Sequence, residues 1–275
     1  MTQNNILVIG GTGKTGRKVA QKLTQLGHHV RIGSRNGVPK FDWENSNTWL
    51  DALAGMDKAY ITFQPDLAVP GAPEAIALLC EKAKESGIQK LVILSGRGEK
   101  EAQHCENIVI NSGLDWSVVR ADWFNQNFSE SFFLEPILAG QVALPRTDIG
   151  IPFIDTDDIA NIVIKALTDD RYNGRILEVT GPDLLTFNEV IATINQATER
   201  VIKLRPISIA EYVDMLRAHQ IPESYIWLIN YLFTNVLDGR NASITNTVEE
   251  VLGRPAKRFS TYVEETAKTG VWEAQ

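Results

Sequence analysis

Apolar side chains along the first two thirds of the chain alternate between two spacings. Short apolar runs rich in β-branched residues, of which residues 6–9 are the first, are typical of buried parallel strands. Between such runs, apolar residues recur at helical spacing, as at Val19, Leu23 and Leu26 before a stop at Gly27. This alternation of strand and helix predicts an α/β fold, a Rossmann-type doubly wound parallel sheet.

The same reading assigns the individual elements of the first domain. After the first strand and helix, we expect strands over residues 29–33, 40–42, 59–63, 90–95 and 116–120, and helices over residues 48–54, 73–86 and 99–111.

A glycine-rich turn joins the first strand to the first helix. It consists of Gly10, Gly11, Thr12, Gly13, Lys14, Thr15 and Gly16. A helix N-terminus presents unpaired N–H groups and the positive end of its dipole, and residues without a Cβ let a pyrophosphate reach both. The glycines match G-x-G-x-x-G and also the wider spacing of short-chain dehydrogenases. The turn therefore predicts a dinucleotide site.

A competing motif overlaps this turn. Gly13, Lys14 and Thr15 resemble the end of a Walker phosphate-binding loop, which requires a glycine five residues before Gly13. Val8, a strand residue, stands there instead. The sequence thus favours a dinucleotide over a nucleoside triphosphate.

The end of the second strand indicates which dinucleotide fits. NAD sites place a carboxylate about twenty residues after the glycine turn to accept from the ribose 2′-hydroxyl, but no Asp or Glu occurs from Arg31 through Phe41. Ser34 can donate to a 2′-phosphate, and Arg35 can add charge and stack on adenine. We therefore expect NADP(H), although ordinary solvated charges at a strand end would give the same pattern.

The pattern changes after residue 121. A helix begins near Thr156, a strand at about 175–180 returns to the sheet, and the rest is mostly helical, with capping-box patterns starting at Thr186, Ser208, Thr247 and Thr261. We expect residues 1–155 to form the NADP(H)-binding domain and residues 183–275 a small helical substrate lobe. Ligands of such sheets bind beyond the C-terminal strand ends, which the lobe would cover.

Composition narrows the function classes. The chain has 275 residues, of which 44% are hydrophobic and 22% charged, with a formal net charge of −7. That charge argues against nucleic-acid and membrane partners. Cys80 and Cys105 lack metal-ligand spacing, so no metal is expected. No leader or bilayer-length apolar run is visible, which predicts a cytoplasmic protein; a homodimer is compatible with the sequence.

With these elements placed, the chain resembles the NmrA-like group of atypical short-chain dehydrogenases, and within it the reductases typified by agroclavine and festuclavine dehydrogenases. The resemblance spans nearly the whole chain. It is carried by the Gly10 to Gly16 turn, by Ser112 to Trp116 leading to Arg120, by Trp123, Phe124 and Asn127, by Ile154, Asp155 and Asp158 to Ala160, and by Thr180 to Pro182.

The resemblance implies positions around the cofactor and the substrate. It places Asp42 and Trp43 near adenine, Phe63, Gln64 and Pro65 on the ribose side, Ser95 and Gly96 near the nicotinamide, and Trp123 and Phe124 beside a substrate pocket. We expect Asn127, Phe153 and Tyr225 to line the same pocket. Aromatic residues more often serve packing, so Trp123 and Phe124 could equally be core. Residues 225–233 are likewise either a core helix or an aromatic lid.

The usual catalytic pair of short-chain dehydrogenases is absent from the sequence. None of the tyrosines is followed by lysine four residues later, so alcohol–ketone chemistry and sugar epimerisation are not expected. Hydride delivery to an electron-poor acceptor, such as an iminium or a quinone, needs no strong protein acid. Lys100 and His104 fit exposed helix positions better than proton donors. The catalytic residues are therefore unknown.

Two functions follow from these observations. The first is an NADPH-dependent oxidoreductase that reduces a planar, hydrophobic, unsaturated small molecule. The second is a non-catalytic NADP(H) sensor of the NmrA type. An apolar chamber would favour the first, and Trp123, Phe153 and residues 225–233 point towards one.

Overall fold

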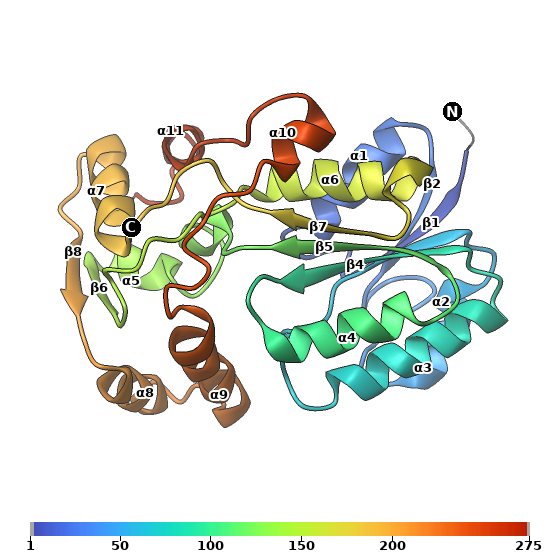
Figure 1. The fold of residues 1–275 in the computed structure, drawn as a ribbon. Helices are drawn as coiled ribbons and strands as arrows, with labels where there is room; N and C mark the ends of the chain where they lie inside the picture. The colour runs from blue at the N-terminus through green and yellow to red at the C-terminus, as the bar shows by residue number, and fades with distance from the viewer. Residues whose placement is uncertain (1–2, 274–275) are drawn as a thin grey trace. The chain divides into compact units, whose positions relative to one another are not determined.

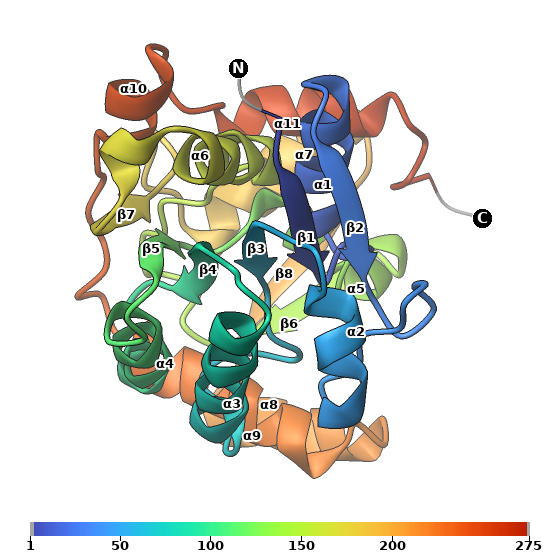
Figure 2. The ribbon, with the colours of Figure 1, turned by 90° about the vertical axis from the view of Figure 1, so that its right-hand side faces the viewer.

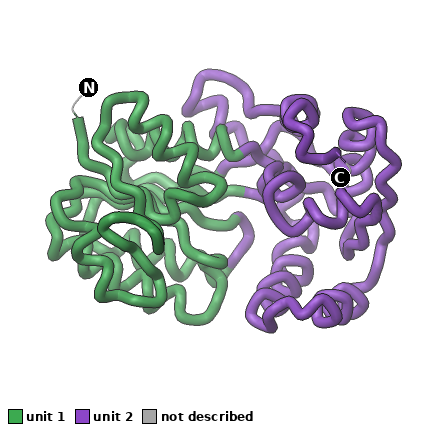
Figure 3. The backbone as a smooth tube through the Cα atoms, turned by 180° about the vertical axis from the view of Figure 1, so that it is seen from behind, with its two compact units in different colours: residues 1–96, 100–121, 156–178 green, residues 97–99, 122–155, 179–275 purple. Residues whose placement is uncertain are grey.

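The computed structural model describes residues 3–273, and its chain falls into two compact units (Figure 3). Unit 1 comprises residues 1–96, 100–121 and 156–178; unit 2 comprises residues 97–99, 122–155 and 179–275. These bounds differ from the expected division at residue 155. Residues 122–155 belong to unit 2 because Phe128, Phe133 and Phe153 are buried in its core.

Unit 1 is built on a six-stranded sheet with the order β2-β1-β3-β4-β5-β7. The pairs from β2 through β5 are parallel, so their C-terminal ends lie at one edge. The strands are β1 (Asn5–Ile9), β2 (His29–Gly33), β3 (Lys58–Ile61), β4 (Lys90–Gly96), β5 (Asp115–Ala121) and β7 (Arg175–Val179).

Helices cover both faces of this sheet (Figures 1 and 2). One face carries α1 and α6, and the other carries α2, α3 and α4. On the second face, Leu7, Ile9 and Leu91 enter a continuous apolar core. The helices are α1 (Gly16–Gln25), α2 (Trp49–Leu53), α3 (Ala72–Glu85), α4 (Lys100–Ile110) and α6 (Thr156–Thr168), with short 3-10 turns at Ser46–Thr48 and Asp170–Tyr172.

The strand expected over residues 40–42 is wrong. Pro39 has no N–H to give to a ladder, and the Phe41 N–H donates to the Ser34 carbonyl at 2.9 Å, which closes a loop after β2. Phe41 then packs its ring against Trp49 at a centroid distance of 5.6 Å. Phe41 lies between polar neighbours, a pattern that predicts a strand, but in the structure its ring packs a loop against Trp49.

Lys90, at the start of β4, is the least favourably placed charge of unit 1. Its side chain is buried, and its Nζ has no hydrogen-bond partner in the described part of the chain. The neighbouring Lys58, next to it in register, instead donates from Nζ to the Leu167 carbonyl at 2.7 Å. Burial, and then the charge of Lys58, lower the pKa of Lys90.

We expect Lys90→Met to raise the free energy of unfolding at pH 7 by about 1–3 kcal/mol, the usual cost of a buried unpaired polar group. The unfolded chain holds the Lys90 proton to a higher pH than the fold does, so wild-type stability rises with pH between the folded pKa and about 10.4. Lys90→Met removes that slope. Urea unfolding at several pH values measures both effects.

Lys58→Met is the matched control and is expected to lower the free energy of unfolding. Equal stability of Lys90→Met and the wild-type protein would contradict the account.

Unit 2 is mostly helical around an aromatic core. A two-stranded parallel sheet pairs β6 with β8. The core contains the stacked and edge-on rings of Phe128, Phe133 and Phe187. The elements are a 3-10 turn at Asn125–Phe128, α5 (Leu134–Leu138), β6 (Gln141–Leu144), α7 (Phe187–Thr198), β8 (Lys203–Pro206), α8 (Ile209–Ala218), α9 (Glu223–Tyr231), a π-helix at Leu232–Val236, α10 (Thr247–Leu252) and α11 (Phe259–Ala267).

Of the four capping boxes predicted in unit 2, two have a hydrogen bond to the predicted N-cap side chain and two do not. At α7 the complete box forms between Thr186 and Glu189, and at α8 the Ser208 side chain accepts from the Glu211 N–H. The prediction at Thr247 is wrong, because that residue is already helical and Asn246 is the N-cap. The prediction at Thr261 is also wrong, because α11 begins at Phe259. Residues 3–273 contain no helix long and apolar enough for a bilayer crossing.

Candidate cofactor and substrate sites

The glycine turn lies at the C-terminal end of β1, between β2 and β3, where the strand order reverses. Such a switch point is the usual ligand crevice of an open parallel sheet. The Gly10 N–H donates to the Gly33 carbonyl at 2.8 Å, and the Gly13 N–H donates to the Gly10 carbonyl at 2.9 Å. These bonds hold the turn tightly against the two strand ends.

The turn leaves no room for side chains at its key positions. A Cβ on Gly16 would lie 2.2 Å from the Gly10 carbonyl oxygen, and a Cβ on Gly10 would lie 1.9 Å from Thr62 Oγ1. Gly10 also has φ of +72°, which favours glycine. Since α1 begins at Gly16, the first N–H groups of that helix have no acceptor within it. This cradle fits the pyrophosphate of a dinucleotide.

The Thr15 hydroxyl is engaged within the protein. The Thr15 side chain is buried, and its Oγ1 accepts a hydrogen bond from the Tyr60 hydroxyl at 3.1 Å. The α1 helix begins at Gly16. Residues 10–15 are therefore a loop around the expected phosphate position.

The residues expected at the 2′-phosphate and adenine lie in the loop after β2. Ser34 is half-buried and Arg35 is exposed. Asp42 pairs with Lys40, whose Nζ lies 2.9 Å from Asp42 Oδ2. The Lys40 hydrogen bond lowers the pKa of Asp42, and the charges of Lys40 and Arg35 add to this shift. Asp42 is thus a paired carboxylate rather than an acceptor for a ribose hydroxyl.

An aromatic cluster stands beside this loop. Trp43 donates from Nε1 to the Thr62 carbonyl at 3.2 Å, and its ring lies 4.6 Å from that of Phe63, centroid to centroid. This contact places Trp43 against the exit of β3, where Gln64 is exposed and Pro65 half-buried. The structure therefore brings together the residues expected on the adenine and ribose sides.

Ser95 and Gly96 end β4, on the strand beside β3. The Ser95 side chain is 5% exposed, and its Oγ has no hydrogen-bond partner among residues 3–273. A buried hydroxyl normally has a partner. This orphaned group at the ligand edge of the sheet is consistent with a polar ligand atom nearby.

The helix after β4, where a catalytic tyrosine and lysine would lie in many dehydrogenases, offers no such pair. Lys100 and His104 are exposed positions of α4. Elsewhere, burial raises the pKa of Tyr60, Tyr212 and Tyr262 above its ordinary value. A catalytic tyrosine needs the opposite shift. Residues 3–273 also contain no cluster of metal-ligand side chains.

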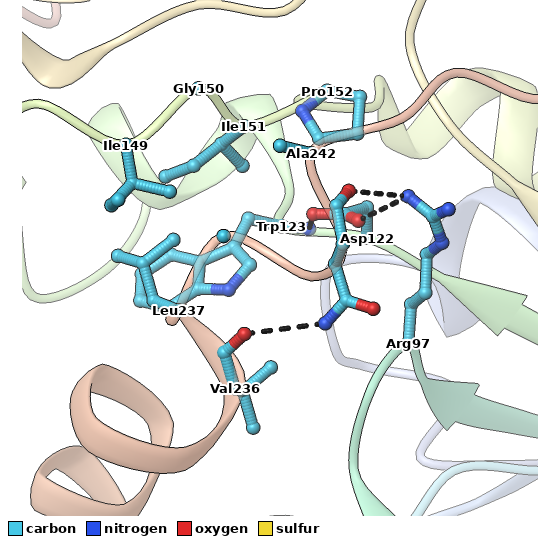
Figure 4. A pocket seen from close by; sticks show the side chains of 12 residues that line it. Arg97, Asp122, Trp123, Ile149, Gly150, Ile151, Pro152, Val236, Leu237 and Ala242 are labelled. Atoms are coloured by element: carbon cyan, nitrogen blue, oxygen red, sulfur yellow. Dashed lines mark hydrogen bonds and ion pairs between the residues drawn. The ribbon is translucent and has the colours of Figure 1, made fainter.

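Unit 2 contains a small pocket against Trp123 (Figure 4). Its apolar walls come from Ile149, Ile151, Val236 and Leu237, and Arg97 and Asp122 lie at one side. Its volume is about 10 Å³, which is room for about one water molecule. Arg97 and Asp122 form a buried ion pair with Nη1 and Oδ2 3.2 Å apart.

Of the five expected pocket residues, Trp123 alone lines this pocket. Phe153 is 1% exposed within the ring cluster of the core, and Phe124 forms a β-bridge with Ile154. Asn127 is half-buried, and Tyr225 on α9 is 44% exposed. Of residues 225–233, Ile226, Leu228 and Phe233 are buried, which agrees with the core interpretation, while Tyr225 and Trp227 are exposed; their role as an aromatic lid stays a prediction.

Sequence reasoning missed Arg97 and Asp122. Each stands directly after a strand end, where a charged residue ordinarily indicates solvent. Arg97 bonds to Asn241 and Ser243, more than a hundred residues further along the chain. No local pattern could have revealed that pairing.

Comparison with protein families gives a match over residues 100–264, more than half of the chain, to the NmrA-like family. The chain belongs to the NmrA-like family.

Relatives of this NmrA-like protein extend over nearly its whole length. Prestalk A differentiation protein A of Dictyostelium discoideum is 28% identical over 96% of this chain and 93% of its own length. Festuclavine synthase I of Penicillium roqueforti is 26% identical over 94% and 97%. The NAD(P)H azoreductase of Xenophilus azovorans is 27% identical over 94% and 96%.

Solved structures show the same fold. A nucleoside-diphosphate-sugar epimerase from Staphylococcus aureus superposes with a TM-score of 0.81 at 18% identity, covering 94% of this chain and 99% of that one. The NADPH-dependent quinone oxidoreductase QOR2 of Escherichia coli, in complex with NADPH, gives 0.76 at 17% identity, with coverage of 94% and 99%. The negative transcriptional regulator NmrA, in complex with NAD, gives 0.72 at 18%, with 98% of each chain covered.

Proposed function

We propose that this NmrA-like protein is an NADPH-dependent oxidoreductase that reduces a planar, hydrophobic, unsaturated small molecule such as a quinone or an iminium. The observation that carries the proposal is the glycine turn, in which Gly16 and Gly10 approach each other too closely for any side chain. Relatives named as an azoreductase and a festuclavine synthase, and a quinone oxidoreductase of the same fold, support this substrate class.

The residues of unit 1 would divide the binding of the cofactor among them. The backbone of residues 10–16 would hold the pyrophosphate, and Ser34 and Arg35 the 2′-phosphate. Asp42 and Trp43 would border adenine, Phe63, Gln64 and Pro65 the ribose side, and Ser95 and Gly96 the nicotinamide. Bound NADPH would supply a hydride from nicotinamide C4.

The residues of unit 2 would position the acceptor. Trp123 offers a flat ring on which a planar molecule can lie, and apolar walls exclude water from it. Phe124, Asn127, Phe153 and Tyr225 remain proposed members of the substrate region. Because the chain has no Tyr-x-x-x-Lys pair, catalysis would rest on holding the acceptor in place, which restricts it to acceptors that are already electron-poor.

A second candidate is a non-catalytic NADP(H) sensor, as NmrA itself is named a transcriptional regulator. The observation that favours it is the size of the Trp123 pocket, about 10 Å³, in which no planar acceptor fits without movement.

One assay separates the two candidates. Purified protein and NADPH are mixed with quinones, cyclic imines, azo dyes and triphenylmethane dyes, and the absorbance of the reduced cofactor is followed. We expect enzyme-dependent loss of that absorbance with at least one acceptor. Tight NADPH binding without turnover of any acceptor would contradict the reductase and support the sensor.

A further inference from the structure

We propose that Arg97 is a positioning residue that sets the width of the pocket beside Trp123. It does so by holding the backbone of residues 236–243 in place as one wall of that pocket. The identity of the occupant, a planar acceptor, rests on the proposed function, whereas the restraint on the wall does not.

Arg97 makes an unusually complete set of bonds within unit 2. It is 8% exposed, and its Nη1 donates to the carbonyls of Asn241 at 2.8 Å and Ser243 at 2.7 Å. Its Nη2 donates to Ser243 Oγ at 2.7 Å. Asp122 balances its charge through Oδ2, and Asp122 Oδ1 accepts from the Trp123 N–H at 2.9 Å. One guanidinium therefore ties a distant segment to the residue beside Trp123.

A second contact holds the same segment. A Cβ on Gly98, whose φ is +82°, would lie 1.9 Å from Asn241 Nδ2. That Nδ2 also donates to the Val236 carbonyl at 3.2 Å. The Asn241 side-chain bond and the Arg97 bonds thus act on one short stretch of backbone.

This stretch supplies the wall of the pocket. Val236 and Leu237 line it opposite Ile149 and Ile151. Val236 is the last residue of the π-helix Leu232–Val236 and Leu237 is its C-cap, and the Leu237 N–H donates back to the Leu232 carbonyl at 2.8 Å. Short π-helical turns are frequent at functional sites. Phe233, within the turn, sets its ring edge-on to Trp123 at 5.4 Å.

The pocket is too small for an acceptor, so a restraint on its wall affects which acceptors can bind. Small-molecule sites usually enclose about 300–1,000 Å³, and this one encloses about 10 Å³. We infer that an acceptor comes to lie on Trp123 when Val236 and Leu237 move outward. That movement breaks the bonds from Arg97 to Asn241 and Ser243 while the pair with Asp122 stays intact. The restraint therefore disfavours wide acceptors more than narrow ones.

The test compares two planar probes, a two-ring naphthoquinone and a three-ring anthraquinone, by their dissociation constants from the NADP-loaded protein. We expect Arg97→Met to shift the ratio of the two constants at least about fivefold towards the larger probe, Ser243→Ala to shift it less, and Arg97→Lys to restore part of the wild-type ratio. Arg200→Met is the matched control, because Arg200 also donates to two carbonyls of unit 2, those of Trp272 and Leu138.

Hydrogen–deuterium exchange of residues 236–243 without any quinone gives a readout independent of substrate. We expect exchange there to become faster in Arg97→Met and to stay at the wild-type rate in Arg200→Met. An unchanged probe ratio, unchanged exchange, or failure of every variant to bind either quinone would overturn the proposal. NADPH oxidation by the wild-type protein reports separately on the reductase function, so a shift in binding without turnover would refute only that function.

Discussion

Gly16→Ala is expected to weaken the binding of both NADPH and NADH by about 100-fold, or about 2.7 kcal/mol, which is in the range for losing one hydrogen bond to a charged group. The added Cβ would lie 2.2 Å from the Gly10 carbonyl oxygen, so the turn has to open and its N–H groups move from the phosphate position. Isothermal titration calorimetry with each cofactor measures the loss.

Two further glycines make this test specific. Gly13→Ala is expected to have a smaller effect, because its Cβ would lie 3.2 Å from the same oxygen and needs only a slight adjustment. Gly150→Ala in unit 2 meets only ordinary contact, at 3.5 Å from Leu184, and should leave cofactor binding unchanged. If Gly16→Ala is folded and binds NADPH as well as Gly150→Ala does, the glycine turn is not the pyrophosphate site.

Arg35→Ala is expected to weaken NADPH by about 10- to 100-fold, in line with about 1.5–3 kcal/mol for hydrogen bonds to a charged group. NADH should change by about twofold at most, because it lacks the 2′-phosphate that Arg35 would contact. The loss should shrink as salt is added, since Arg35 is exposed and its charge is screened. Binding titrations at low and high salt measure this difference.

Arg31→Ala serves as the control for this prediction. Arg31 lies on β2, four residues before Arg35, but its Nη1 donates to the carbonyls of Ala52 and Ala54 at the end of α2. Its loss should lower stability and leave the preference between the two cofactors as in wild type. Equal weakening of NADPH and NADH by Arg35→Ala would remove the basis for choosing NADP(H).

The parts of unit 1 that depend on local patterns could be predicted from the sequence. Short, β-branched apolar runs such as residues 6–9 favour a buried strand, and the adjacent glycines leave few alternatives to a phosphate turn. Residues 40–42 escaped prediction because Phe41 is buried by long-range contacts with Trp49 and not by a ladder. Local alternation cannot distinguish these two kinds of burial.

The substrate side could be predicted less well, because tertiary contacts decide it. Phe153 and Trp123 are both aromatic, yet one is sealed among core rings and the other lines a pocket. The sequence shows Arg97 only as a charged residue. In the fold it is buried and donates hydrogen bonds to backbone carbonyl groups, which every residue possesses. No side-chain pattern encodes a bond to backbone carbonyls far along the chain.

The central claim is that the first helix and its glycine turn bind a redox dinucleotide with a 2′-phosphate. Calorimetric titration of the wild-type protein with NADPH and with NADH, under the same conditions, tests it most directly. The account predicts saturable one-site binding with NADPH at least about tenfold tighter than NADH, a difference of about 1.4 kcal/mol. No heat with either compound, or tighter binding of NADH, would contradict it.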